Sequence, residues 1–442
     1  MRSSRNLDTV AVTFDDDNLV ANAGLILPAT LAQHLGLEAL IDAKVSLPDT
    51  SAGWRPGRKA LTLVHSMIAG GNFIDDADVL RSGSSAVVLG HVVMAPSTLG
   101  TFLRAHTFGN VRQLDSVNAE ALRRAWAAGA GPATGTALVV DVDSTICRVF
   151  GHAKQGATFG YTKVRGYHPL LAFRADTGEI LAARMRKGSA NTARGMKRFL
   201  EELRGHLRHA GWTGQVVLRC DSGFWSRTVI GFCEKHHWEY SITVRQTPGV
   251  RALIDDIAPG GDSCRWHPMV DYPATGVCEI GECDYDEDLD AHRRLIVRRV
   301  ALLDTKQEAL FPTWDHHAFI TNRTGPMEVE DLHHRAHAVC ELAIRDLKGN
   351  GLAHCPSGKF HANSAWLSLA MLAHNLTRWT VQIGTGQDRL ITGATIRRTL
   401  IATPGRMAHS ARRYTLHLPT RWPWANTFTT ILDQLRTLRL AT

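Results

Sequence analysis

The sequence predicts an α/β protein with a mixed β-sheet core, a β-rich insertion in that core and a helical region in front of it. Three observations predict this class. Helix-type patterns fill the first part of the chain, apolar strand-like runs alternate with amphipathic helices in the middle, and two of those runs end in acidic residues. Strands and helices in this order are typical of a mixed α/β sheet.

The composition indicates a globular protein with a basic surface. The chain has 442 residues, of which 44% are hydrophobic and 21% charged, enough for a large core. We expect a cytoplasmic protein without a membrane span, because the sequence shows no signal-peptide pattern and no long apolar run. The net charge is +8, which favours a polyanionic partner over a membrane surface. The eight cysteines form no CxxC pair, so we expect reduced thiols.

Residues 1–135 are predicted to form a helical N-terminal domain. The stretches "PATLAQHLGLEALI" (28–41) and "PSTLGTFLRAHTFGN" (96–110) each predict a short helix that a glycine interrupts. The Gly/Ala/Pro-rich stretch 127–137 is a candidate linker to the next part of the chain.

Residues 136–246 are predicted to form the first part of the sheet core. Its apolar runs predict strands, and the "DTG" between two of them predicts a hairpin turn. The amphipathic stretch 191–211 predicts a helix that Asn191 or Thr192 caps. The expected strands are "ALVVDVDS" (137–144), "HPLLAFRA" (168–175), "EILAARMR" (179–186), the run "QVVLRCDSGF" (215–224) that ends in an acid, and "EYSITVRQ" (239–246), with a second helix at 226–237.

The rest of the chain divides into three parts. Residues 247–324, rich in Asp, Gly and Pro with short strand-like pieces, predict the β-rich insertion. Residues 325–383 contain two helices and predict the second part of the core, and residues 384–442 form a basic C-terminal region that is partly strand.

The first helix of the second core part has an unusual polar face. Within "HHRAHAVCELAIRDLK" (333–348), His334, His337, Glu341, Arg345 and Lys348 recur every three or four residues. An α-helix places residues with this spacing on one side. A solvated, ion-paired surface would explain the pattern, but the acidic residues elsewhere favour a functional face.

Those acidic residues follow two predicted strands. Asp141 and Asp143 end the first strand, and Asp221 ends the apolar strand in "VLRCDSGF". Ligands in α/β sheets gather at the carboxyl ends of strands, and Mg²⁺ prefers carboxylate oxygens, so Glu341 is the candidate for a third ligand. Either Asp141 or Asp143 could be the reactive acid, because alternate residues share a face of a strand. Asp221 could instead be no more than a cap of the helix near Ser226.

The motifs "DVDST", "GATFGYTKVRGYHPLLAFRADTGEILAARMRKGSAN", "LRCDSGF" and "HAVCELAIRDLKGNGLAHCPSGKFHANSAWLSLAMLAHNLTRW" occur in this order. Together they resemble a DDE-type bacterial insertion-sequence transposase, and more narrowly the insertion-sequence group designated thirteen-eighty. The resemblance covers about residues 138–383. It implies an RNase H-like core, with an insertion domain between the second and third acids.

The resemblance also implies roles for individual residues. Asp143, Asp221 and Glu341 match the three catalytic acids, which hold two Mg²⁺ ions (or Mn²⁺) in this family. Lys348 matches the lysine that follows the last acid. His334 and His337 stand where the wider branch has Tyr and Arg, so we expect them to face DNA with Arg345 and Lys348.

The implied activity is DNA transposition, in which a phosphodiester is hydrolysed at each transposon end and the freed 3′-hydroxyl attacks target DNA. Double-stranded DNA and a second copy of the chain in a synaptic homodimer are the expected partners, in the nucleoid of a bacterial cytoplasm. Residues 1–135 are the expected site of end recognition. A nuclease without strand transfer and an inactive DNA-binding relative are the competing hypotheses. Four arginines on a predicted strand of the insertion are further candidates for DNA contact: Arg293, Arg294, Arg298 and Arg299. Alternatively, their charges only keep a solvent-exposed edge strand from pairing with another chain.

Overall fold

A nine-stranded mixed sheet forms the centre of the computed structural model, which describes residues 7–48, 50–160, 162–257, 265–269, 277–285, 292–302, 313–388 and 390–438. Its strand order is β10-β11-β12-β13-β9-β8-β2-β6-β7. Strand β2 runs parallel to β8, and β8 parallel to β9, whereas β6 and β7 are antiparallel. The predicted RNase H-like mixed sheet is therefore confirmed. Its first five strands in the chain are β2 (Leu138–Ser144), β6 (Leu170–Arg174), β7 (Ile180–Arg184), β8 (Val216–Cys220) and β9 (Glu239–Thr243).

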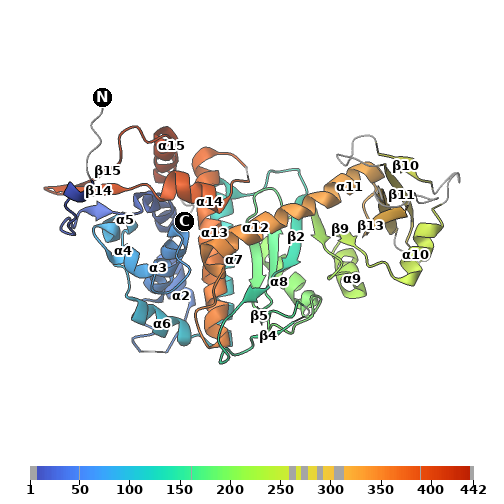
Figure 1. Ribbon diagram of the computed structural model, residues 1–442, viewed down its shortest axis with the longest axis horizontal. Coiled ribbons are helices and arrows are strands. Elements are labelled where there is room, and N and C mark those ends of the chain that lie inside the picture. The colour runs from blue at the N-terminus through green and yellow to red at the C-terminus, as the bar shows by residue number, and fades with distance from the viewer. Residues whose placement is uncertain are drawn as a thin grey trace.

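The strands of the insertion extend this sheet. Strand β13 pairs antiparallel with β9, so the sheet continues from the core into the insertion without a break (Figure 1). Strand β12 has a partner on each side and is not an edge strand, contrary to one of our expectations. The elements are α10 (Pro248–Asp255), β10 (His267–Pro268), β11 (Cys278–Asp284), β12 (Arg294–Leu302) and β13 (Thr313–Thr321).

The N-terminal region is helical, as predicted. Gly36 adopts a left-handed conformation with φ of 61° between the first two helices, which explains the break in the first predicted helix. The candidate linker begins inside a π-helical extension of α7, residues Trp126–Ala130. The helices are α1 (Ile26–His34), α2 (Leu37–Lys44), α3 (Pro56–Ala69), α4 (Ala77–Arg81), α5 (Ser85–Leu89), α6 (Pro96–Arg104) and α7 (Phe108–Ala125).

Helix α13 (Phe360–Thr385) joins the N-terminal helices to the sheet. It is buried from Ala362 to Gly384 and packs against α1, α3, α6 and α7 of the N-terminal region and against β7 of the sheet (Figure 1). The indole N–H groups of Trp126 and Trp379 both donate to the buried carboxylate of Glu179. The N-terminal helices and the sheet therefore share one hydrophobic core.

Two helices connect successive strands of the sheet: α8 (Met196–His209) lies between β7 and β8 in the chain, and α9 (Arg227–Lys235) lies between β8 and β9. Helix α8 begins after Gly195, so neither Asn191 nor Thr192 caps it. Asn191 lies in the preceding turn, where its side chain accepts from the backbone N–H of Ala193. Helix α9 is capped by Ser226, whose hydroxyl accepts from Val229 N–H.

A long helical segment runs across the sheet, where its side chains contact β2, β9 and β12 (Figure 1). It consists of α11 (Met327–Arg335), a 3₁₀ turn (Ala336–Val339), α12 (Cys340–Leu347) and a π-type end (Lys348–Leu352). The remaining elements are 3₁₀ turns Leu7–Thr9 and Ala23–Leu25, β1 (Leu19–Val20), β3 (Cys147–Arg148), β4 (Thr158–Phe159), β5 (Arg165–Tyr167), α14 (Gly393–Ile396) with a π-type end (Arg397–Ile401), β14 (Gly405–Ser410), β15 (Arg413–His417) and α15 (Ala425–Arg436).

None of the described helices is by itself long and apolar enough to cross a membrane, and the one pair that together reaches that length, residues 23–34 and 37–44, is bent by 53°. The seven cysteines in the described ranges are free thiols, and Cys264 lies outside those ranges.

Candidate active site at the carboxyl ends of two parallel strands

Asp143 and Asp221 lie at the same end of neighbouring parallel strands. Val142 of β2 is in register with Cys220 of β8, and the two acids are the next residue on each strand. Burial and the negative charge of Asp221 raise the pKa of Asp143, although a hydrogen bond from Ser144 N–H opposes this effect. No described Lys or Arg forms an ion pair with either acid. In the described ranges, no Lys or Arg therefore compensates the repulsion between the two carboxylates, and weaker effects of His337 and Cys340 lower the pKa of Asp143.

Asp141 has a different environment, although it lies on the same face of β2. It is 1% exposed, and its two oxygens accept from Arg219 Nε at 2.7 Å and Nη2 at 2.8 Å. His337 Nδ1 lies 2.9 Å from Asp141 Oδ1 as well. Asp141 is thus a fully compensated structural carboxylate, and of the two candidates on this strand only Asp143 has oxygens available for a ligand.

Arg219 connects this buried pair to the crossing helix. Its Nη1 donates to the backbone carbonyl of His333 on α11. One guanidinium therefore holds β2, β8 and α11 together below the two acids. Sequence reasoning did not identify this residue, although an arginine inside the apolar run "VVLRC" was a signal of a buried ion pair.

The predicted polar face of the 333–348 helix is divided in the structure. His334 points to the sheet, where its Nδ1 lies 2.6 Å from Ser241 Oγ and its Nε2 lies 2.9 Å from Thr243 Oγ1. Its ring also stacks on Phe319 with a centroid distance of 4.3 Å. With both nitrogens occupied, His334 is a structural residue, and our expectation that it faces DNA is wrong.

The 3₁₀ turn at Ala336–Val339 explains the division. Each 3₁₀ residue turns the chain by about 120° instead of the 100° of an α-helix, so four residues shift the phase by about 80°. His337 consequently contacts Asp141, whereas Glu341 and Arg345 are exposed and Lys348 is half-buried. Within the described ranges, neither Arg345 nor Lys348 forms an ion pair, so both cations remain available to a phosphate.

The environment of His334 makes stability depend on pH. Burial, with smaller effects of nearby cations, lowers its pKa from 6.5 to about 3. Between pH 6.5 and about 3, this histidine is therefore protonated in the unfolded chain but neutral in the folded protein. The free energy of unfolding consequently falls by about 1.4 kcal/mol for each pH unit as the pH decreases through this range. We expect His334→Gln to reduce proton uptake on unfolding by about one in that range. Urea unfolding at neutral and mildly acidic pH measures this, and an unchanged pH dependence would contradict the burial of the ring.

Cys340 packs the crossing helix against Asp143, and Glu341 is the next residue on that helix. Cys340 is buried with its Sγ 3.7 Å from Asp143 Oδ2, and burial and the neighbouring carboxylates raise the pKa of this thiol. Glu341 is the next residue, but its side chain lies on the exposed side of α12. In the described ranges, no three His, Cys, Asp or Glu side chains are close enough together to hold an ion. The structure therefore brings Asp143 and Asp221 together, whereas the side chain of Glu341 is exposed on α12 and does not join them.

The acid pair nevertheless has the chemistry of a site for divalent cations. Mg²⁺ binds carboxylate oxygens, usually from one or two side chains, and keeps several water ligands. A bound cation would also remove the repulsion that raises the pKa of Asp143. Asp221 is not the helix cap that we considered, because Ser226 caps α9 and Asp221 only accepts from Gly223 N–H in a local turn.

His168 is a further residue of this region that the sequence did not point to. Its Nε2 lies 2.9 Å from Ser144 Oγ and its Nδ1 lies 2.9 Å from the carbonyl of Ala190. It thus holds the end of β2 next to Asp143. No pattern in the sequence could have identified it, because its contacts join three separate segments.

The four arginines of the insertion are already paired with carboxylates. Arg298 is buried, and the guanidinium of Arg299 lies over the rings of Trp266 and Trp314 at 4.0 Å and 4.3 Å. A DNA phosphate would have to displace these partners, so we do not include this strand in the candidate site. The pairs are Arg293–Glu234, Arg294–Glu282, Arg298–Asp331 and Arg299–Glu279.

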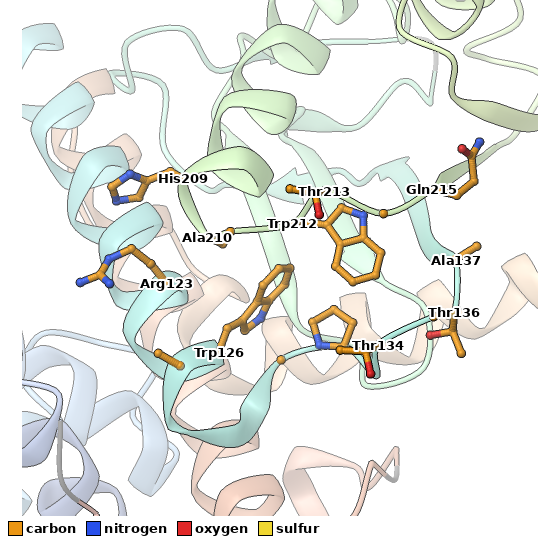
Figure 2. A pocket seen from close by; sticks show the side chains of 16 residues that line it. Arg123, Trp126, Thr134, Thr136, Ala137, His209, Ala210, Trp212, Thr213 and Gln215 are labelled. Carbon is orange, nitrogen blue, oxygen red and sulfur yellow. The ribbon is translucent and has the colours of Figure 1, made fainter. Parts of the chain in front are cut away.

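A cavity of about 720 Å³ lies at the other end of the parallel strands (Figure 2). The rings of Trp126 and Trp212 project into it, and residues before Leu138 of β2 and Val216 of β8 line it. Its basic side chains, those of Arg123 and His209, both contact Glu120. This cavity is therefore separate from the acids and electrostatically compensated.

Two carboxylates at the ends of neighbouring parallel strands of a mixed sheet are the kind of oxygen donors that Mg²⁺-dependent phosphoryl transfer uses. The chain belongs to the family described as transposase DDE domain group 1, which matches residues 3–440. This membership confirms the resemblance to DDE transposases at the level of the family.

Two further comparisons are less informative. No curated protein matches the sequence. A cryo-EM structure of the piggyBac transposase synaptic complex with hairpin DNA is similar over 96% of this chain and 83% of that chain, with 10% sequence identity and a TM-score of 0.48.

Proposed function

We propose that this protein is a DNA transposase that hydrolyses a phosphodiester at each end of an insertion sequence and joins the freed 3′-hydroxyl to target DNA. The observation that carries the proposal is the uncompensated pair of Asp143 and Asp221 at the ends of β2 and β8. Within the family, we propose the insertion-sequence group designated thirteen-eighty and a bacterial, cytoplasmic setting.

Asp143 and Asp221 are the proposed ligands of two Mg²⁺ or Mn²⁺ ions, with Glu341 as the third carboxylate. When bound, such ions activate an attacking oxygen and stabilise a leaving oxygen. Glu341 follows Cys340, which touches Asp143, and its side chain is exposed, so in this proposal that side chain turns toward the acid pair when the ions bind. Arg219 and Asp141 keep the strands and α11 in place during this movement.

Arg345 and Lys348 are the proposed phosphate contacts beside the acids. Three carboxylates by themselves would repel a DNA backbone, and cations on the same helix reduce that repulsion. His337 lies closer to the sheet, where its contact with Asp141 makes it a positioning residue in our proposal. End recognition by the N-terminal helices and a homodimer on DNA complete the proposal.

The test uses the full-length protein, a DNA fragment with the inverted repeats that flank its gene, and a supercoiled target plasmid. We expect cleaved ends and joined products with Mg²⁺ or Mn²⁺, and neither product with EDTA. Cleavage without joining would indicate a nuclease, and end binding without cleavage would indicate a DNA-binding relative. Point substitutions are preferable to deletion of the N-terminal helices, because these helices share a core with the sheet.

A further inference from the structure

A second large cavity lies between the N-terminal helices and the segments that follow β2 and α12. Its volume is about 630 Å³. Phe73 and Arg104 line it from the N-terminal region, Arg148, Phe150 and Lys154 line it from the chain after β2, and His354 lines it from the chain after α12. We refer to these six residues as the aromatic–basic groove.

The positive charges of the aromatic–basic groove are available to a ligand. In the described part of the chain, no carboxylate pairs with Arg104, Arg148 or Lys154. The guanidinium of Arg148 lies over the ring of Phe150 at 4.8 Å, and Lys154 Nζ donates to the backbone carbonyl of Cys355. One acidic residue, Asp75, also lines the cavity, so three cations face one carboxylate. The cavity of Figure 2 differs, since its basic side chains, Arg123 and His209, both contact the carboxylate of Glu120.

The aromatic rings of the groove are unusually exposed. Phe150 is 65% exposed and Phe73 is 50% exposed, and Phe73 stacks on His354 with a centroid distance of 4.3 Å. Exposed rings among uncompensated cations form the arrangement that binds unpaired nucleotides, since bases stack on the rings and phosphates contact the cations. Paired bases in a duplex cannot stack on side chains in this way.

The groove is close enough to the acids to hold the same DNA molecule. Arg148 follows Asp143 by five residues, so their Cα atoms are at most about 18 Å apart. A DNA strand covers that distance in about five nucleotides.

We propose that the aromatic–basic groove binds unpaired nucleotides of the DNA strand next to the phosphodiester at Asp143 and Asp221. Bases stack on Phe150 and Phe73, and phosphates contact Arg104, Arg148 and Lys154. This inference rests on the proposed function, because it assumes that the acids act on DNA.

The experiment measures equilibrium binding of the full-length protein to two labelled DNA duplexes by fluorescence anisotropy in EDTA. Both carry the inverted repeat, and one has five unpaired nucleotides beside the cleavage position. We expect the wild type to bind the duplex with unpaired nucleotides more tightly. Phe150→Ala should reduce that preference by about fivefold to a hundredfold, the range that loss of base stacking produces. Phe159→Ala is the matched control, since Phe159 is 66% exposed on the neighbouring β4 but does not line the groove.

The outcomes separate the two proposals. Equal binding of both duplexes by the wild type, or a preference that Phe150→Ala retains, would overturn the groove while end cleavage with Mg²⁺ still supports the transposase. Failure to bind either duplex would overturn both proposals. Cross-linking of Phe150 to 5-iodouridine in the unpaired segment, but not in the paired repeat, would support the groove directly.

Discussion

Replacement of Asp221 by asparagine is expected to reduce the rates of end cleavage and strand transfer by about a thousandfold or more. The amide keeps the shape and the local hydrogen bond from Gly223 N–H but loses the charge that a divalent cation requires. DNA binding in EDTA should change little, because phosphate contacts are assigned to other residues. Single-turnover cleavage of labelled ends measures the rate.

The same variant tests the electrostatics of the acid pair without any assay of activity. Asp221 raises the pKa of Asp143, so the ionised form of Asp143 is destabilised in the metal-free folded protein. Removing the charge of Asp221 relieves this repulsion, and Asp221→Asn should be at least as stable as the wild type in EDTA at neutral pH. Mg²⁺ should raise the melting temperature of the wild type but not of the variant.

An exposed acid provides the control for both measurements. Asp78→Asn changes a carboxylate on α4 that pairs only with Arg81 at the surface. It should leave the cleavage rate and the response to Mg²⁺ unchanged. If Asp221→Asn cleaved the ends at the wild-type rate, the assignment of the catalytic acids would be wrong.

Replacement of Arg219 by methionine is expected to destabilise the fold by about 3–5 kcal/mol, the cost of leaving one partner of a buried ion pair without the other. Arg219 and Asp141 are 3% and 1% exposed, so water cannot replace the lost contacts. The loss of the bond to the His333 carbonyl also frees α11. Urea unfolding followed by circular dichroism measures the change in the free energy of unfolding.

Two further variants make this result specific. Arg198→Met removes an exposed partner of Glu202 and should cost no more than about 1 kcal/mol. The double variant Arg219→Met, Asp141→Leu should be more stable than Arg219→Met alone, because no charge is then left buried. A loss for Arg219→Met as small as that for Arg198→Met would show that the pair does not organise the site.

Much of the core could be predicted from local patterns. The apolar runs that end at Ser144 and Cys220 are strands in the structure, and the 333–348 stretch is helical almost throughout. Buried positions recur every two residues along a strand and about every 3.6 residues along a helix, so the order of apolar and polar residues within a short stretch predicts them. The spacing of the acids within these patterns, together with the resemblance, was therefore sufficient to select Asp143, Asp221 and Glu341 as candidates.

The partners of charged residues could not be predicted in this way. Whether Asp141 or Asp143 is compensated depends on Arg219, which lies 78 residues away from Asp141 in the chain and on a different strand. The arginines of β12 have their partners on other elements, and that strand is an interior one only because β11 and β13 flank it.

The sequence by itself thus determined the class of the fold, its order of strands and helices and the acids at the strand ends. Only the tertiary structure decided which acid is free, that a 3₁₀ turn separates the inward-facing His334 from the exposed Glu341, and that exposed rings and unpaired cations of the described residues form a groove beside the site. The physical reason is that local periodicity fixes which residues are buried, whereas the energy of a buried charge depends on contacts between distant segments.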